Sequence, residues 1–277
     1  MSVVAAGRRH SVTCRPDGTV AAWGNSRAGE CAVDSWTDVV AVAAGNVHTA
    51  PNTGRSHTIG LRRNGTVLAT GWNGDGQGNV SAWQNITAVA AGWRFSLGLR
   101  ADGTVVAAGR DATGQRSVRN WCDITSLSAG DWHSVGIRGD GTAVAVGNSR
   151  RGQCDVSDWS GLSSVSAGCL HTVALRADGS VVATGERGTG ACNVFNWEGA
   201  TAISAGSHHT IALFDDGTVR AAGNNDFGQC DVQDWMGVVD IAAGSLHTIG
   251  LLADGTIVAT GSNRDGQCDV GGYEVRS

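Results

Sequence analysis

The chain has 277 residues, including 42 glycines, 10 tryptophans and only 2 prolines, and its formal net charge is −5. It contains no run of basic residues, which argues against nucleic acid as a main partner, because binding to phosphates needs clustered arginine and lysine. No apolar run approaches membrane-spanning length, and Met1 leads directly into a strand-like run without a signal peptide, so we expect a cytoplasmic protein that does not bind membranes.

A unit of about 38 residues repeats along the chain, and a period of this length is typical of solenoids, arrays and propellers. Each copy closes on an aromatic residue, namely Trp36, Trp83, Trp121, Trp159, Trp197, Trp235 or Tyr273. The second copy is longer because it carries an insertion at residues 46–54. We therefore expect one domain over 1–277, with copies at approximately 1–36, 37–83, 84–121, 122–159, 160–197, 198–235 and 236–273.

Four short apolar runs follow one another in each copy, separated by glycine-rich turns. In the last copy they begin near residues 238, 247, 256 and 268, and the turn between the second and third is Asp254-Gly255. An Asp-Gly or Asn-Gly pair stands at this turn in every copy and is typical of a two-residue β-hairpin. No stretch sustains the apolar period of a helix. The sequence thus predicts four antiparallel strands per copy.

Seven such units predict an all-β fold, a seven-bladed β-propeller with four antiparallel strands per blade. The first run of each copy is rich in alanine, which suits the crowded strand nearest the axis. The closing aromatic ring suits a position between two blades. An open solenoid is the alternative, but its end copies should resemble caps, and here they resemble the middle ones. Because the first copy begins at its own first strand, we expect the ring to close without strand exchange.

Two turns vary among the copies while their surroundings repeat. One follows the Ala-Gly pair after the first run, and the other follows the third run. In chain order, these turns and the insertion carry Arg8, Arg9, Asn46, Pro51, Asn52, Trp93, Arg94, Asp131, Trp132, Arg150, Arg151, Leu170, His208, Phe227 and Leu246. Both turns should emerge on one face, opposite the Asp-Gly turns.

A scaffold that keeps one face constant and diversifies the other uses the varied face for contact. We therefore predict that the varied residues form the binding site. Trp93, Arg94 and Trp132 are the predicted anchors, because tryptophan and arginine dominate interface energetics. The alternative for the two tryptophans is that they pack against neighbouring turns.

The candidate metal ligands occupy repeated positions. A histidine recurs in six copies and is replaced by Phe95 in the third; the six are His10, His57, His133, His171, His209 and His247. A ring of imidazoles could bind metal, but we expect these histidines to hydrogen-bond backbone near the turn. The repeated cysteines are expected to be small buried thiols. No nucleophile motif, phosphate loop or carboxylate pair is evident, so we predict no catalytic residue, no metal site and no cofactor.

The pattern A-G-x-x-H-[ST]-x-x-L, followed by D-G-T-V and G-x-N-x-x-G-Q, resembles the regulator of chromosome condensation repeat in all seven copies. The resemblance implies a seven-bladed propeller. That family includes a nucleotide-exchange factor for a small GTPase, a plant ultraviolet-B photoreceptor and a secreted bacterial inhibitor of β-lactamases. Residues 92–96 are similar to the photoreceptor's Gly-Trp-Arg-His-[ST] turn, with Phe95 at the histidine. The G-Q-C-D-V-x-x-W ending is similar to that of bacterial members.

We accordingly predict a monomeric, non-enzymatic bacterial scaffold that binds a protein partner through the face of the variable turns. The resemblance implies a second hypothesis, guanine-nucleotide exchange on a small GTPase, with residues 46–54 as a wedge. A third hypothesis is an enzyme, or a metal- or ligand-binding protein, that uses the axial funnel. Release of nucleotide from candidate GTPases would separate the second hypothesis, and a ligand or metal bound to the purified protein would separate the third.

Overall fold

The computed structural model describes residues 2–45 and 55–270, and in this part of the chain it contains strands and turns but no helix. Each repeat forms one antiparallel sheet of three strands, paired in chain order. The first strands of the seven sheets are β1 (Val4–Ala6), β4 (Val39–Ala44), β7 (Ile86–Ala91), β10 (Ile124–Ala129), β13 (Leu162–Ala167), β16 (Ala200–Ala205) and β19 (Val238–Ala243).

The middle and outer strands complete the sheets. The middle strands are β2 (His10–Cys14), β5 (His57–Arg62), β8 (Phe95–Arg100), β11 (His133–Arg138), β14 (His171–Arg176), β17 (His209–Phe214) and β20 (His247–Leu252). The outer strands are β3 (Val20–Gly24), β6 (Val67–Gly71), β9 (Val105–Gly109), β12 (Ala143–Gly147), β15 (Val181–Gly185), β18 (Val219–Gly223) and β21 (Ile257–Gly261).

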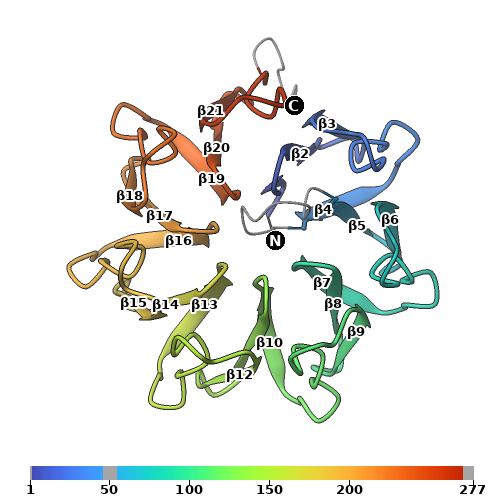
Figure 1. Cartoon of the computed structure of the whole chain (residues 1–277), viewed down its shortest axis with the longest axis horizontal. Helices are drawn as coiled ribbons and strands as arrows, with labels where there is room; N and C mark the ends of the chain where they lie inside the picture. The colour runs from blue at the N-terminus through green and yellow to red at the C-terminus, as the bar shows by residue number, and fades with distance from the viewer. Residues whose placement is uncertain (1, 46–54, 271–277) are drawn as a thin grey trace.

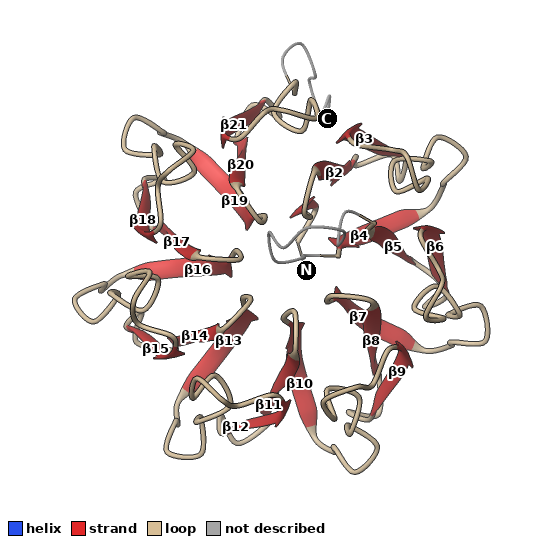
Figure 2. Ribbon diagram, in the orientation of Figure 1, coloured by secondary structure: helices blue, strands red, loops and turns tan. Residues whose placement is uncertain are grey.

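The seven sheets stand around one central axis, with the first strand of each sheet nearest that axis (Figures 1 and 2). Alanine, serine and valine side chains of these inner strands line a central channel of about 370 Å³. Small side chains occur here because seven strands converge on a narrow space. The chain is therefore a seven-bladed β-propeller, and the predicted fold class is confirmed.

The ring closes between the seventh and the first blade without strand exchange in the described residues. Strand β1 pairs with β2 inside the first sheet, as the sequence predicted. Across the seam, the Asp240 carboxylate accepts hydrogen bonds from the backbone N–H of Val3 at 2.9 Å and of Val4 at 3.3 Å, and from the Ser2 hydroxyl at 2.9 Å. Burial raises the pKa of this carboxyl. Polar contacts and packing, rather than a shared strand, thus hold the seam.

The expectation of a fourth strand per blade is wrong. In the first repeat, the segment after β3 forms consecutive tight turns, in which the Gly29 N–H donates to the Ser26 carbonyl at 3.0 Å and the Ala32 N–H to the Gly29 carbonyl at 3.0 Å. Donors used in such local bonds cannot pair with a neighbouring strand. The half-buried Cys31 thiol donates to the Asn25 carbonyl at 3.4 Å, so the cysteine fixes the turns rather than a strand.

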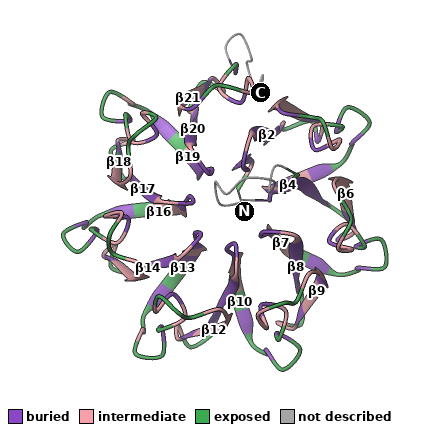
Figure 3. Cartoon of the chain, viewed as in Figure 1, coloured by how far each residue is buried: buried purple, intermediate pink, exposed green. Residues whose placement is uncertain are grey.

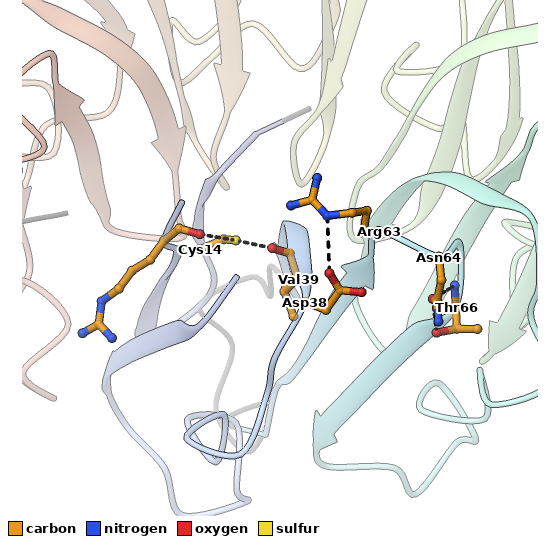
Figure 4. A network of polar contacts seen from close by, with 7 residues as sticks. Cys14, Asp38, Val39, Arg63, Asn64 and Thr66 are labelled. Carbon is orange, nitrogen blue, oxygen red and sulfur yellow. Dashed lines mark hydrogen bonds and ion pairs between the residues drawn. The ribbon is translucent and has the colours of Figure 1, made fainter. Parts of the chain in front are cut away.

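The Asp-Gly turns also differ from the expected two-residue hairpin. In the second blade, the Arg62 N–H donates to the Thr66 carbonyl at 2.9 Å and the Gly65 N–H to the Arg62 carbonyl at 2.9 Å. Only the glycine has positive φ, at 78°, which is a type I turn closed by a left-handed glycine. The Asn64 side chain accepts from the Thr66 N–H and hydroxyl at 3.0 and 2.7 Å (Figure 4). The loop therefore has three residues and is closed by a side-chain cap.

The closing tryptophans lie between blades, as predicted. Trp36, which is 6% exposed, belongs to the first repeat but packs against the middle strand of the second blade. A Cβ on Gly60 of that strand would lie 2.6 Å from the Trp36 ring, and Gly98 faces Trp83 in the same way at 2.8 Å. Buried residues run through the middle strands, and exposed residues concentrate in the outer turns (Figure 3). Trp121 on Gly136 and Trp235 on Gly250 repeat this contact, whereas the fifth and sixth blades have alanine at the glycine position.

Candidate functional site

The first and third turns of each blade lie together on one rim of the ring, which we call the variable rim. In all seven blades, a backbone N–H just after the outer strand donates to a carbonyl of the first turn; the Arg110 N–H, for example, bonds to the Arg94 carbonyl at 2.8 Å. Gly109, at φ +103°, permits this approach, because a Cβ there would collide with the same carbonyl. The two turns that vary along the chain therefore form a continuous surface.

Backbone bonds also join the first turns of successive blades. The Trp93 N–H donates to the Gly130 carbonyl at 3.4 Å, the Asp131 N–H to the Gly168 carbonyl at 3.3 Å, and the Ser245 N–H to the Gly7 carbonyl at 3.1 Å. The last of these bonds crosses the seam where the ring closes. The variable side chains are thus carried on a backbone that is fixed from blade to blade.

The repeated histidines form bonds between blades rather than to nearby backbone, so that expectation is wrong. The His133 Nε2 atom lies 2.8 Å from the Thr172 hydroxyl of the next blade, and that hydroxyl donates to the Gln153 carbonyl at 2.7 Å. Because the hydroxyl has one proton and gives it to the carbonyl, the imidazole must carry the proton on Nε2. His247 repeats the contact with Ser11 across the closing seam at 2.9 Å. These histidines are structural.

Phe95 interrupts this set of contacts. It occupies the histidine position in the third blade, is fully buried and has no ring nitrogen to offer to the next blade. Ser134, the hydroxyl that a histidine there would meet, still donates to the Gln115 carbonyl at 2.7 Å. The seam between the third and fourth blades therefore lacks one hydrogen bond that six other seams have.

Trp72, Trp93, Arg94, Arg110 and Trp132 form a cluster on the variable rim, which we call the Trp–Arg cluster. The Trp93 and Trp132 rings meet edge to face with centroids 4.2 Å apart. The Arg94 guanidinium lies 4.5 Å from the Trp72 ring centre and 4.9 Å from that of Trp93, and Arg110 lies 5.0 Å from Trp93. Such stacking is favourable because the ring faces are electron-rich.

The two tryptophans predicted as anchors differ in exposure. Trp93 is only 6% exposed, whereas Trp132 is half-buried. Trp93 lies among two arginines and another tryptophan, so it packs against neighbouring turns, which was the alternative considered for both rings. Trp132 and Arg94 are the members of the predicted anchor set that solvent reaches.

Arg94 has an unusual backbone conformation. Its φ is +63°, and the other non-glycine residues with positive φ in the described chain are Asp38, Asn85 and Asp123. Aspartate and asparagine tolerate this region, whereas a long side chain is strained there by about 1–2 kcal/mol. Strain of this kind persists where the surroundings enforce it, and it concentrates at functional sites. An ion pair with Asp75 at 3.5 Å adds to the contacts that hold Arg94.

An arginine-lined cavity of about 510 Å³ opens beside this cluster and spans the first three blades; we call it the arginine cavity. Its lining residues are Arg9, Asn25, Arg27, Ala28, Arg55, Trp72 and Arg94. Arg9 pairs with Asp265 at 3.5 Å, and Arg94 pairs with Asp75. Arg27 and Arg55 are exposed and form no ion pair with any residue that the structure describes. The cavity is therefore strongly basic.

A second cavity of about 340 Å³ lies between the sixth, seventh and first blades; we call it the Phe227 pocket. It brings together several predicted residues, and its lining includes Arg8, Arg9, His208, Phe227, Leu246 and Arg264. The Arg264 guanidinium lies 5.3 Å from the Phe227 ring centre. Burial lowers the pKa of His208, so the imidazole is neutral at pH 7. The pocket offers an aromatic ring beside arginines.

The remaining predicted residues do not join these two cavities. Asp131 is fully buried beside Cys169, and burial together with this carboxylate raises the pKa of the thiol. Leu170 is half-buried, and Arg150 and Arg151 are exposed on the third turn of the fourth blade. Asn46, Pro51 and Asn52 lie outside the described residues. The predicted set therefore divides among the Trp–Arg cluster, two cavities and scattered positions.

Sequence reasoning missed Trp72, Arg110, Arg27 and Arg55. Trp72 and Arg110 stand directly after the glycine that ends the outer strand, where three other blades have asparagine. A comparison of the copies at that one position would have singled them out. Arg27 and Arg55 lie in the variable turns, but their approach to each other depends on how two blades are placed in the ring and could not be predicted.

Over 2–45 and 55–270, no group of three or more histidine, cysteine, aspartate or glutamate side chains could hold a metal ion. The central channel is lined mainly by alanine, serine and valine, and its carboxylate, Asp240, bonds to the first strand. No helix that could cross a membrane occurs in the described chain.

Comparison with known proteins places the chain among propellers. Yeast RCC1 (Prp20), in a structure bound to Kap60, superposes with a TM-score of 0.73 at 16% identity, covering 98% of this chain and 83% of that one. The ectodomain of the Physcomitrella patens receptor kinase CR4 gives 0.72 at 20% identity, covering 94% and 73%. Human WBSCR16 gives 0.70 at 17% identity, covering 89% and 85%. At these identities the likeness shows the fold alone.

The sequence itself matches the regulator of chromosome condensation (RCC1) repeat at residues 52–77, 86–115, 124–153, 200–229 and 238–267, more than half of the chain. No curated protein matches the chain significantly in sequence. The first and fifth blades lie outside the matched ranges but form the same three-stranded sheet. The repeat thus extends around the whole ring, and the chain belongs to the RCC1 repeat family.

Proposed function

We propose that the chain is a binding module that docks a protein partner on its variable rim. The observation that supports this is the contrast between the two rims. The variable rim carries the Trp–Arg cluster, the arginine cavity and the Phe227 pocket. The opposite rim repeats one capped turn, in which an aspartate or asparagine accepts from the following threonine or serine.

The composition of the variable rim suits protein recognition. Trp132 is half-buried against the Trp93 ring, and Phe227 is 37% exposed. Arginines lie close to both sites. Aromatic and arginine side chains supply most of the binding energy in protein interfaces. Similar propellers bind proteins as well: yeast Prp20 was crystallised with Kap60, and a second Prp20 structure is described with its binding to Gsp1p and histones.

Capture of partners from an extract of the source cell tests this proposal. Trp132→Ala and Phe227→Ala on the variable rim should each weaken retention of a specific partner, by about 2 kcal/mol for a residue that anchors the interface. Asp178→Ala, which removes a turn cap on the opposite rim, is the control and should leave retention unchanged. If Asp178→Ala abolished retention while the two variable-rim variants did not, the docking surface would lie on the opposite rim and the proposal would be wrong.

Nucleotide exchange on a GTPase is not favoured by any feature of the described rim. Residues 46–54, the proposed wedge, lie outside the described residues. The likeness to Prp20 at 16% identity concerns the fold. Addition of the captured partner to a nucleotide-release assay distinguishes the two functions, because a docking module leaves the rate of release unchanged.

A further inference from the structure

The arginine cavity combines four guanidinium groups contributed by three blades. Arg9 and Arg27 come from the first blade, Arg55 precedes β5 of the second, and Arg94 lies in the first turn of the third. Among the described residues, no acidic side chain lines the cavity. A chain whose net charge is −5 thus concentrates positive charge at one place, and like charges gathered at a concave surface raise the local concentration of anions.

Three carboxylates bond to residues that line the cavity. Asp265 pairs with Arg9 and accepts from the Asn25 amide at 2.8 Å. Asp75 pairs with Arg94 at 3.5 Å. Glu30 is buried and accepts from the Ala28 N–H at 2.8 Å. These carboxylates orient two of the arginines and leave Arg27 and Arg55, which are exposed, to meet a ligand.

The site is also partly preorganised. Arg94 is held between the Trp72 and Trp93 rings in a backbone conformation that it would rarely adopt otherwise. Holding a guanidinium in place before binding reduces the entropy lost on binding. The equivalent residues in the first turns of the other described blades do not have a positive φ. Packing of the blade therefore does not require the strained conformation of Arg94.

The guanidinium groups of the cavity indicate the kind of anion. Guanidinium presents paired donors that match phosphate and carboxylate oxygens. A phosphomonoester carries a charge of about −1.5 to −2 and three acceptor oxygens, so it can engage several arginines at once, whereas one carboxylate has two oxygens and a single charge.

We propose that the arginine cavity binds a phosphomonoester group. The group is carried either by a phosphorylated side chain of the protein partner or by a small phosphate ester. The proposal deepens the function given above and rests on it only for the first of these sources. Arg27 and Arg55 make the contacts that the ligand gains on entry, and Arg94 and Arg9 form the fixed wall.

Isothermal titration of the full chain with four probes tests the proposal. The probes are the blocked tripeptide acetyl-Gly-phosphoserine-Gly-amide, its serine and glutamate analogues, and glycerol 2-phosphate. The phosphoserine peptide should bind at least tenfold more tightly than either analogue. The double variant Arg27→Gln with Arg55→Gln should weaken its binding at least tenfold while the melting temperature stays close to that of the wild type.

The matched control is Arg150→Gln with Arg151→Gln, which removes two exposed arginines from the same rim and changes the net charge equally. It should leave the affinity within about twofold. Equal weakening by both double variants, equal binding of the glutamate and phosphoserine peptides, or no heat with either phosphate probe would each overturn the proposal.

The two phosphate probes separate the sources and the two proposals. Tighter binding of the phosphoserine peptide than of glycerol 2-phosphate supports a phosphorylated partner. Equal binding supports the site with a small ester as its ligand, even if no protein is retained on the variable rim. Conversely, a partner retained through Trp132 and Phe227 without any phosphate binding would leave the docking function standing and remove the phosphate site.

Discussion

At the scale of single residues, Arg94 shows how contacts can overrule backbone preference. Its side chain is stacked on Trp72 and Trp93 and paired with Asp75, and these contacts hold a φ of +63°. The substitution series at this position separates the two effects, since alanine and glycine both remove the side-chain contacts but only glycine removes the strain.

We predict that Arg94→Gly is more stable than Arg94→Ala, by about 1 kcal/mol in the free energy of unfolding, because glycine adopts a positive φ without strain. Leu170 occupies the same turn position in the fifth blade without a positive φ, so there the order should reverse, with Leu170→Gly less stable than Leu170→Ala. Denaturant titration of the four variants measures both differences. The same order at the two positions would show that Arg94 is not strained.

Trp93 and Trp132 differ in burial and therefore in what their removal should do. Trp93→Ala should lower the free energy of unfolding by about 3–5 kcal/mol, as expected for a buried aromatic side chain, because it lies under its neighbours at 6% exposure. Trp132→Ala should cost clearly less. Thermal and chemical unfolding of both variants provides the check, and a neutral Trp93→Ala would remove the packing role assigned to that ring.

At the scale of elements, the sequence correctly predicted the features in which one residue type recurs at the same position of the copies. The inner, middle and outer strands, the closing tryptophans and the shared rim all follow from features that recur in each copy. The prediction of a fourth strand was wrong, because the sequence of a short apolar run such as Cys268 to Val270 does not show that its N–H groups are used in tight turns. Residue type suggested that the histidines bond locally, whereas their partners lie one blade away.

The candidate site was harder to predict than the fold. Trp93, Arg94 and Trp132 were identified because their turn varies, but their burial depends on Trp72 and Arg110, which come from other turns. The arginine cavity was not predicted at all. Its four arginines all lie in the two variable turns, three in first turns and Arg27 in a third turn, but their convergence on one cavity depends on how neighbouring blades are placed in the ring.

Strand β1 is short, and its attachment at the closing seam depends on one carboxylate. Asp240→Ala should lower the free energy of unfolding by about 1–3 kcal/mol, because the partly buried N–H groups of Val3 and Val4 lose their acceptor. Ser164→Ala at the same position in the fifth blade is the control and should be nearly neutral. Hydrogen exchange should also quicken selectively in β1; uniform exchange across all blades would contradict the closing role of Asp240.

At the scale of the whole molecule, the six repeated histidines tie stability to pH. Burial lowers the pKa of each to about 3 or 4 from an ordinary value of 6.5. The folded state keeps them neutral, while the unfolded chain takes up protons below pH 6.5. Their contribution to stability is therefore complete above pH 6.5 and is lost as the pH falls towards 4.

We predict acid unfolding near pH 5. At that pH each histidine costs on the order of 2 kcal/mol, and six such costs match the total stability of an ordinary domain. His133→Phe imitates the natural state of the third blade, removes one titrating group and should move the acid midpoint to lower pH. Circular dichroism of the wild type and of His133→Phe between pH 8 and 3 provides the check. An unchanged midpoint would show that the histidines do not control the transition.

The closing seam between β19 and β1 has a further consequence. It is crossed by no strand in the described residues and is held by a carboxylate, a histidine–serine contact and a turn-to-turn backbone bond. One junction of the ring thus forms between complete sheets without any covalent continuity. A peptide break placed in another interblade loop, such as residues 157–161, would produce two fragments whose sheets are all intact. Such fragments carry matching faces at both ends and should reassemble into the ring when produced together.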